Sequence, residues 1–495
     1  MAKQPKSNRK KVLISKKSRN RLILIPFIAF VIKLVMIARI QGFDWFAAGG
    51  NDVTKGISLL LEKNYVPAHI WYGADGENYL RGLAALARDG FFSTERNLHY
   101  WPAGYPLLMW PLLLIFKGSF FFALATFQSL LYALGCAFFV NELRQTRLTK
   151  FAPFVAIFLT FNPTLTLNTL AIGYELPTVS LSLIAMGALL RNFRLKIDQI
   201  ITSDMVLSGI CFMLASFMQP RLIVIALGFF VIWGLAKYRF PSAILFVLFS
   251  FLIVSLAPAT MIVRNSKANG FAAISTNLGV TMGIGAGPEA TGGYNGKYNG
   301  VPCPAADRAS NPAKADNEKV KCILDWYISN PTSALKLSWN KSVYFWSPWF
   351  GPAANGTMAR NPWRINHPLA ETIKTEEGFK KIYGTAGKWI SWLWMVFALA
   401  MMFYGFIVLW RVRDVEQLTG LIALSTVIIN WLSSVATIGD HRFRIPSMGM
   451  SLFLQTVGFV ALFIRGRKRF SGTSTTVEWP GLRWNAKHQT DNLPS

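Results

Sequence analysis

Apolar runs of about 20 residues recur along this chain, and that length is what a helix needs to cross a bilayer. Charged residues make up only 15% of the chain, against about 25% in soluble domains. The first apolar run is long and lacks a small-residue cleavage site, so we expect it to remain as an anchor. The sequence therefore predicts an all-α, polytopic membrane protein.

The distribution of the net charge of +27 along the chain predicts how the protein is oriented in the membrane, and does not indicate nucleic-acid binding. Residues 1–21 hold nine Lys or Arg and no acid, and later basic clusters fall in short connections between apolar runs. Cytoplasmic loops carry such an excess, and a basic tail also attracts anionic membrane lipids. No Arg-rich groove or nucleic-acid motif is present in the sequence, so we expect no nucleic-acid partner.

Span length and loop charge together predict about ten spans with both termini in the cytoplasm. The expected spans are about 22–40, 119–140, 151–170, a fourth ending before Arg191, 205–218, a sixth ending at Lys237, 241–263, 389–410, a ninth ending near Thr437 and a tenth ending at Ile464. The domain plan is a basic tail (1–21), a transmembrane domain (22–464) with external loops 41–118 and 264–388, and a cytoplasmic tail (465–495).

The run Tyr105–Phe116 is apolar but only about a dozen residues long, which suits an interfacial helix better than a span. If this run crossed the membrane, Arg144, Arg147 and Lys150 would lie outside. If it lies flat, they lie inside, as the charge rule prefers. We therefore predict that it lies at the outer interface.

The first external loop carries the strongest catalytic candidates, Asp75 and Glu77, at the start of an amphipathic helix. Asp75 stands near Trp71 and Tyr72, and partial burial there would raise its pKa toward the range of a general base for an acceptor hydroxyl. Helix capping explains Asp75 about equally well, and the two roles are compatible. Glu77 is the weaker candidate.

Aromatic side chains surround this helix and the turn that follows it. They suit a stacking platform for a sugar or acceptor, although anchoring at the membrane interface is the commoner use of Trp and Tyr. The residues concerned are Tyr79, Tyr100, Trp101 and Tyr105.

A late tight turn holds His441, Arg442 and Arg444 and is ended by Pro446. Guanidinium groups suit a lipid phosphate because they hydrogen-bond it in a bidentate manner. External Arg residues also snorkel to ordinary headgroups, but two of them in one turn run against the inside-positive trend and favour a function. Arg221 and Arg264, at other external span ends, are lesser candidates for the same phosphate.

The remaining candidates lie in the second external loop. Residues 274–293 are dense in glycine and can cradle a phosphate or a sugar, although a plain loop is the simpler interpretation. Cys303 and Cys322 share this loop and can form a disulfide in an oxidising compartment. The five His show no metal-ligand spacing, so we predict no metal site and no cofactor, and leave a divalent cation open.

Four segments in this order resemble the GT-C glycosyltransferases. DGENY is similar to their acidic first-loop motif, and YWPAGYPLL to the Trp-Pro-x-Gly-Tyr-Pro element of bacterial members. The stretch RNSKANGFAAISTNLGVTMGIGAGPEATGG resembles the segment after a central span, and HRFRIP resembles their late Arg-Pro turn. The similarity runs from Leu22 to about Ile464, and the proteins that the chain resembles are bacterial relatives of protein O-mannosyltransferases and the lipid A aminoarabinose transferase.

The resemblance implies a GT-C-like catalytic domain over 22–464 in the bacterial inner membrane. It implies a polyprenyl-phosphate sugar donor, an envelope glycan, lipid or protein as acceptor at the periplasmic face, and inverting displacement. Asp75 would be the base, and Arg442 and Arg444 would bind the donor phosphate. The chain departs from the mannosyltransferases at Gly76, where an acid often follows the Asp, and in having no large soluble domain in its external loop.

Two other functions compete with this interpretation. A lipid-linked oligosaccharide flippase or transporter would favour polar residues at mid-membrane and internal repeats, whereas the charged candidates here cluster at external span ends. A non-catalytic envelope assembly subunit would be favoured by loss of the first-loop Asp, but Asp75 is present.

Overall fold

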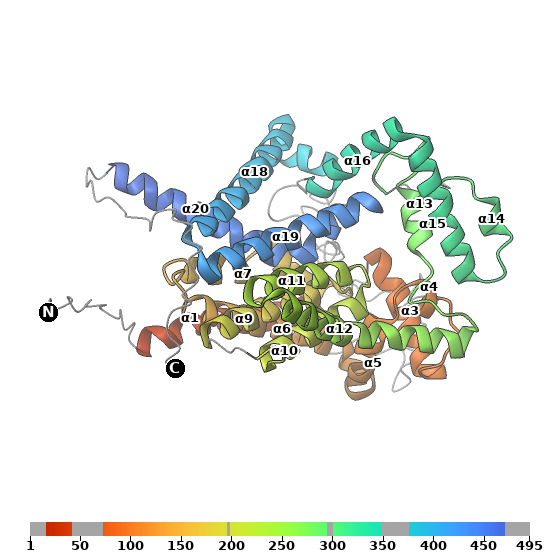
Figure 1. The fold of residues 1–495 in the computed structure, drawn as a ribbon, viewed down its shortest axis with the longest axis horizontal. Helices are drawn as coiled ribbons and strands as arrows, with labels where there is room; N and C mark the ends of the chain where they lie inside the picture. Colours follow the sequence, from red (N-terminus) through yellow and green to blue (C-terminus); the bar gives the residue numbers. More distant parts are fainter. Residues whose placement is uncertain (1–15, 42–72, 196–198, 295–299, 348–375, 471–495) are drawn as a thin grey trace, which may run out of the picture.

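The computed structural model describes residues 16–41, 73–195, 199–294, 300–347 and 376–470, and these contain helices but no strand. Most of the long helices lie side by side along the longest axis of the molecule (Figure 1). Six helical segments in the described residues are long and apolar enough to cross a membrane. The protein is therefore an all-α membrane protein, as the sequence predicts.

Single helices cover every expected span except the third, and several extend beyond the expected bounds. They are α1 (Lys16–Gln41), α6 (Phe120–Leu143), α9 (Glu175–Leu195), α10 (Ser203–Met218), α11 (Leu222–Lys237), α12 (Phe240–Asn269), α18 (Glu376–Val412), α19 (Asp414–Ala436) and α20 (Met448–Phe470). The apolar part of α1 (Leu22–Ala38), α10 and α11 are shorter than the six spanning segments.

The expected third span, 151–170, is not one continuous helix. It is divided into α7 (Ala152–Thr160), α8 (Pro163–Leu167) and the 3-10 turn η2 (Asn168–Leu170). The division lies at Asn162, whose side chain accepts a hydrogen bond from the backbone of Leu165 and so caps a new helix that begins with a proline. Asn at the cap and Pro at the first position both favour a helix start, which explains the interruption.

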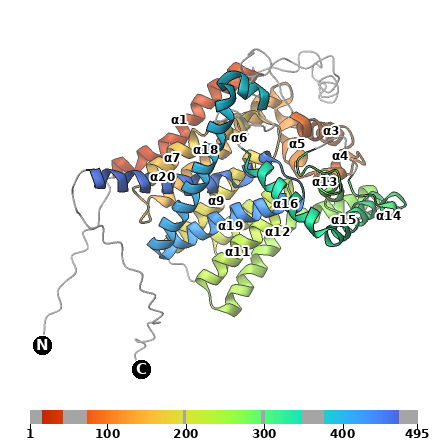
Figure 2. The ribbon, with the colours of Figure 1, turned by 90° about the horizontal axis from the view of Figure 1, so that it is seen from above.

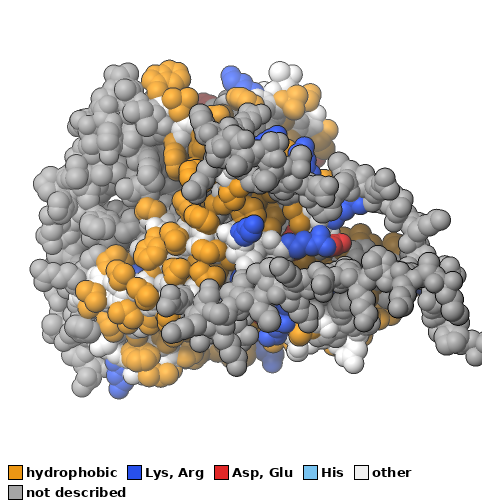
Figure 3. Space-filling view, turned by 90° about the vertical axis from the view of Figure 1, so that its left-hand side faces the viewer, with side chains coloured by type: hydrophobic (Ala, Val, Ile, Leu, Met, Phe, Trp, Pro, Cys, Tyr) orange, Lys and Arg blue, Asp and Glu red, His pale blue; other side chains and the backbone are white. Residues whose placement is uncertain are grey.

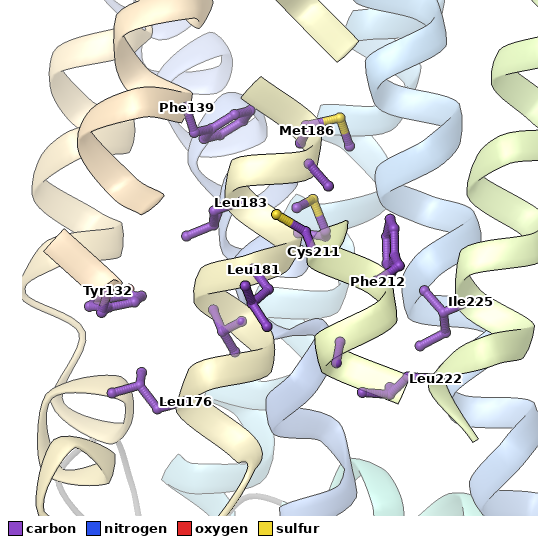
Figure 4. Close-up of a cluster of buried hydrophobic side chains, with 14 of the residues drawn as sticks. Tyr132, Phe139, Leu176, Leu181, Leu183, Met186, Cys211, Phe212, Leu222 and Ile225 are labelled. Atoms are coloured by element: carbon purple, nitrogen blue, oxygen red, sulfur yellow. The ribbon is translucent and has the colours of Figure 1, made fainter. Parts of the chain in front are cut away.

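The core of the bundle is built around α9. Its side chains are buried on nearly all sides, because α6, α10 and α20 pack around it (Figure 4). Close backbone approach helps this packing, since a Cβ at Gly135 of α6 would lie 2.7 Å from the carbonyl oxygen of Ser180 in α9. Small residues at helix contacts are typical of membrane bundles.

Both expected external loops meet at one end of the bundle (Figures 1 and 2). The first contributes α3 (Gly73–Asp89), α4 (Asn97–Tyr100) and α5 (Gly104–Phe116); the second contributes α13 (Leu278–Ile284), α14 (Pro304–Asp307), α15 (Pro312–Ser329) and α16 (Pro331–Trp346). A hydrogen bond of 2.9 Å from the backbone nitrogen of Thr276 to the carbonyl oxygen of His99 joins them.

The start of α1 and the end of α20 lie at the opposite end of the molecule, where Lys and Arg side chains are visible with little Asp or Glu (Figures 2 and 3). Basic residues between the spans are held here by acidic partners. Arg147 pairs with Asp414 at 2.7 Å, and Arg194 pairs with Glu142 at 2.8 Å.

The run Tyr105–Phe116 forms α5, which does not continue directly into α6. The 3-10 turn η1 (Lys117–Ser119) separates the two helices, and Lys117 has a positive φ of 39°. α5 packs against α3, α6 and α10 at the end where the two expected external loops meet. The placement of α5 at the outer interface, with about ten spans and both termini inside, stays a prediction.

Reporter fusions test this topology. We expect a reporter joined after Arg147 to report the cytoplasm and one joined near Asp316 to report the outside, because α5 then adds no crossing. A fusion after Arg194 is the matched control, since it should give the same side as Arg147. An outside signal at Arg147 would contradict the interfacial placement of α5.

Candidate functional site

The late turn is held in shape by local and tertiary hydrogen bonds. It forms the 3-10 helix η4 (His441–Ser447), and the carboxylate of Asp440 caps it by accepting a 2.8 Å hydrogen bond from the backbone nitrogen of Arg442. From α19, the side-chain amide of Asn430 donates to the carbonyl oxygen of Phe443 at 2.7 Å. The direction of the Arg442 side chain therefore depends on both α19 and the cap.

Two arginines from distant parts of the chain meet on one aromatic ring. The guanidinium of Arg221, just before α11, lies 4.2 Å from the ring centroid of Phe443, and that of Arg442 lies 5.2 Å from it. Nη2 of Arg221 also donates to the hydroxyl of Tyr174 at 3.3 Å. We name Arg221, Arg442, Phe443 and Tyr174 the arginine cluster.

The arginine cluster has hydrogen-bonding capacity left for a ligand. The Nε atom of Arg221 is buried and has no hydrogen-bond partner among the described residues. The Tyr174 hydroxyl accepts from Arg221 and, at 3.1 Å, from the side chain of Gln219, so its own proton is directed elsewhere. Burial raises the pKa of Tyr174, against the lowering effect of Arg221, so the hydroxyl keeps that proton at neutral pH.

An acid stands beside the arginine cluster. Glu175 is buried at the start of α9, next in sequence to Tyr174, and its charge also raises the pKa of Tyr174. The carboxylate of Asp440 is a second acid, 4.0 Å from Nε of Arg442, so an anionic ligand would share the two guanidinium groups with two carboxylates.

Arg444 and His441 lie outside the arginine cluster. Nη1 of Arg444 donates to the carbonyl oxygens of Phe345 at 3.1 Å and Ser347 at 3.3 Å, at the end of α16. Nδ1 of His441 lies 3.7 Å from the carboxylate of Asp440. In these contacts Arg442 and Arg444 have different neighbours, and their binding of one donor phosphate stays a prediction.

Arg264 joins the end of α12 to the first of the expected external loops instead of facing the arginine cluster. It is fully buried near the end of α12, and it donates to the carbonyl oxygens of Phe91 at 3.0 Å and Leu98 at 3.1 Å, and to that of Ser93. These contacts use the guanidinium to hold the segment between α3 and α4. Arg264 therefore has a structural role, and its binding of phosphate stays a prediction.

The aromatic candidates fall into two groups. Tyr79 and Tyr105 are buried edge to face with ring centroids 5.1 Å apart, and the Tyr105 hydroxyl donates to Gln128 of α6 at 3.1 Å. Tyr100 and Trp101 are part-exposed and lie 5.4 Å apart. Tyr79 and Tyr105 are therefore core residues of this fold, while a stacking role for Tyr100 and Trp101 stays a prediction.

Asp75 and Glu77 both lie in the first two turns of α3, and their side chains lie outside the described residues. α3 begins at Gly73, so Asp75 stands inside the first turn instead of in the capping position before Gly76. A carboxylate in the first turn is still favoured by the helix dipole. Tyr79, one turn later, joins α3 to α5 through Tyr105.

The glycine-rich segment connects the first loop to the late turn. It starts at the Thr276–His99 hydrogen bond and ends where the backbone nitrogen of Gly439 donates to the carbonyl oxygen of Gly292 at 2.9 Å. A Cβ at Gly285 would lie 2.2 Å from the carbonyl oxygen of Thr437, so the close approach requires glycine. The segment thus reaches the neighbourhood of the arginine cluster, and phosphate binding by its amides stays a prediction.

A disulfide joins Cys303 to Cys322 in α15, as expected, with the Cα atoms 5.9 Å apart. Cys136 and Cys211 are free and buried in the bundle. Within the described residues, no group of three or more His, Cys, Asp or Glu is placed to hold a metal ion.

We expect replacement of both Cys303 and Cys322 by Ser to lower the free energy of unfolding by about 3 kcal/mol, because the bond closes a short loop in the unfolded chain. Non-reducing peptide mapping should recover the two peptides linked, and Cys136 and Cys211 serve as internal free-thiol controls. Recovery of all four cysteines as free thiols would contradict the disulfide.

No protein-family model and no curated protein matches this chain. Among solved structures, it is similar to the archaeal oligosaccharyltransferase AglB from Archaeoglobus fulgidus in complex with an inhibitory peptide and a dolichol-phosphate, at 12% identity and a TM-score of 0.42, over 92% of this chain and 52% of that one. The apo form of the Archaeoglobus fulgidus oligosaccharyltransferase is similar at 12% identity and a TM-score of 0.41, over 90% and 51%. The chain thus spans about half the length of these proteins.

Proposed function

We propose that this chain is a membrane-embedded GT-C-type glycosyltransferase. It moves a hexose or pentose from a polyprenyl-phosphate-linked donor to an envelope lipid, glycan or protein at the periplasmic face of the bacterial inner membrane. The observation that carries the proposal is the arginine cluster, in which Arg221 and Arg442 converge on Phe443 beside Tyr174. Its position in the fold adds support, because the late turn is bonded to the glycine-rich segment of the second external loop.

The chemistry follows from the groups available. An acceptor hydroxyl attacks the anomeric carbon, the new carbon–oxygen bond forms, and the bond from that carbon to the phosphate oxygen breaks with inversion. The electron pair leaves on the lipid phosphate, where fixed guanidinium charge stabilises it. The proton of the acceptor hydroxyl passes to the carboxylate of Asp75, which acts as general base.

Arg221, Arg442 and Tyr174 take the phosphate in this scheme. The buried Nε of Arg221 and the remaining proton of Tyr174 are the donors available to it. Hydrogen bonds from charged donors to phosphate are short and roughly twice as strong as neutral ones. Arg444 and Arg264 shape the site from outside through backbone carbonyl groups.

A flippase or transporter is the second candidate function, and one residue favours it. Lys33 lies inside α1, is only 4% exposed and stands over the ring of Tyr132 at 4.7 Å. An ionisable side chain buried within a span is often functional. Sequence reasoning missed Lys33 because a single lysine in an apolar run gives no sign of whether it faces lipid or protein.

Reconstitution distinguishes the two functions. Purified protein in liposomes with a defined polyprenyl-phosphate sugar and candidate acceptors should release polyprenyl phosphate and form a glycosylated product. Mass spectrometry of envelope lipids, glycans and glycoproteins, with and without the gene, identifies the sugar and acceptor. Movement of the intact lipid-linked sugar between leaflets, with no release of polyprenyl phosphate, would favour the transporter and overturn the glycosyltransferase.

A further inference from the structure

Lys341 is a buried charge in the external part of the fold. It is 1% exposed on α16, on the face shared with Leu337 and Phe345. Its ammonium makes one hydrogen bond within the described residues, of 2.8 Å to the hydroxyl of Tyr327 in α15. Burial lowers the pKa of Lys341 to about 8, so the side chain still carries its charge at neutral pH.

An apolar side chain of similar length would fill this space without the cost of burying a charge. The face of α16 opposite Lys341 makes the contrast clear, because Leu335 and Trp339 are 73% and 71% exposed there. The placement of a lysine on the inner face therefore points to a use for its charge or its hydrogen bond.

Separate chain segments cross at Lys341. A Cβ at Gly439 would lie 2.6 Å from the Cα of Lys341, one at Gly292 would lie 3.0 Å from its backbone nitrogen, and one at Gly285 would lie 2.9 Å from its Cε. The hydroxyl of Tyr327 in turn donates to the carbonyl oxygen of Gly285 at 3.2 Å. The glycine-rich segment thus packs against both the side chain and the backbone of Lys341, and the start of the late turn packs against its backbone.

The same helix contacts the late turn on both sides of Arg442. Lys341 supports the turn at Gly439, and the carbonyl oxygen of Phe345, one helical turn later, accepts from Arg444. α16 is itself fixed to the bundle, because Nε1 of Trp431 in α19 donates to the hydroxyl of Ser342 at 3.1 Å. The position of Arg442 over Phe443 therefore depends on how α16 seats the turn.

We propose that Lys341, through its hydrogen bond to Tyr327, is a positioning residue that holds Arg442 in place for the donor phosphate. The inference rests on the proposed function and deepens it, since it names a residue that acts on the phosphate site without contacting the phosphate. The hydrogen bond locks α15 to α16, and the crossing glycines transmit that placement to Arg442.

The test uses the full-length protein in nanodiscs. Lys341→Met nearly keeps the length of the side chain but removes the charge and the hydrogen bond, and Tyr327→Phe removes both the acceptor for Lys341 and the hydrogen bond to the carbonyl oxygen of Gly285. We expect each to raise the donor KM about tenfold with a smaller change in kcat. The double variant should lose no more than Tyr327→Phe alone, because Tyr327→Phe already removes the hydrogen bond that Lys341→Met removes. Lys341→Arg should recover at least half of the loss, and Lys336→Met on the exposed face of α16 is the matched control.

Hydrogen exchange separates this inference from the proposed function. Lys341→Met and Tyr327→Phe should each speed exchange of the Gly439 amide, which donates to Gly292, at least tenfold. If the wild type turns over no donor, the glycosyltransferase proposal fails. The exchange data still show whether the hydrogen bond between Lys341 and Tyr327 holds the late turn in place. Unchanged donor KM in both folded variants, or a loss of thermal stability with unchanged KM and unchanged Gly439 exchange, would overturn the positioning role.

Discussion

Asp75→Asn is expected to abolish transfer while expression and donor binding stay near those of the wild type. The carboxamide keeps the size of the side chain but cannot take the proton of the acceptor hydroxyl. General-base catalysis contributes roughly 100- to 10,000-fold to a rate, so kcat should fall by at least about 100-fold. The measurement is single-turnover transfer by the reconstituted enzyme, with donor affinity determined separately.

The matched control is Asp89→Asn at the other end of the same helix. Asp89 is exposed and pairs with Arg88 at 2.8 Å, and an exposed ion pair of this kind contributes little to stability. We expect Asp89→Asn to transfer sugar at nearly the wild-type rate. Near-normal turnover of Asp75→Asn would remove Asp75 from the base role, and loss in Glu77→Gln alone would assign the base to Glu77.

The spans were predictable because apolar length and loop charge are local properties of the sequence. The expected span 119–140 is α6, Phe120–Leu143, and the expected 241–263 lies within α12, Phe240–Asn269. The division of the third span at Asn162 also has a local sequence signal, because this Asn precedes a Pro. The long apolar run around Asn162 nevertheless favoured the prediction of one continuous span. α12 extends six residues beyond the expected end of its span at residue 263. This extension matters most for the site, because it places Arg264 inside a helix that reaches the first loop.

The arginine cluster was only half predictable. Arg221 and Arg442 were both visible as external arginines, but their meeting on Phe443 depends on the packing of α11 against α19, which no local pattern encodes. The sequence places Arg442 and Arg444 two residues apart in one tight turn, which favours a shared site. In a 3-10 helix with about three residues per turn, such positions point in different directions, and Arg444 reaches α16 instead.

Tyr174, Phe443 and Lys341 were missed for a related reason. Each is an ordinary residue in its own segment, and each becomes a site candidate only through a partner far away in the sequence. For Tyr174 the partner is Arg221, and for Lys341 it is Tyr327 together with the glycines that cross it. In the sequence, these residues differ from many others only in being polar or aromatic and near a glycine. That pattern is too common to indicate a functional site.

Arg442→Ala and Arg221→Ala are each expected to weaken both donor affinity and turnover about ten- to a hundred-fold. A hydrogen bond to a charged group contributes about 1.5–3 kcal/mol, and the phosphate is charged before and after the sugar leaves. Both guanidinium groups lie over the ring of Phe443, so substitution by Lys, which keeps the charge but loses the planar group, should be partly defective. Kinetics of each variant with a defined polyprenyl-phosphate sugar measure these effects.

Arg444→Ala is the control that separates the arginine cluster from the late turn as a whole. Its guanidinium bonds the end of α16, so its loss should lower the melting temperature more than Arg442→Ala does. Any increase in donor KM should be smaller than for Arg442→Ala, because Arg444 acts on the site only through α16. In a double-mutant cycle, the losses of donor binding free energy from Arg221→Ala and Arg442→Ala should be less than additive. Removal of either arginine lets the phosphate move away from the one that is left, so the second substitution removes a weaker interaction. If Arg444→Ala alone changes donor affinity, the phosphate lies at the α16 side of the turn, and the arginine cluster is not its site.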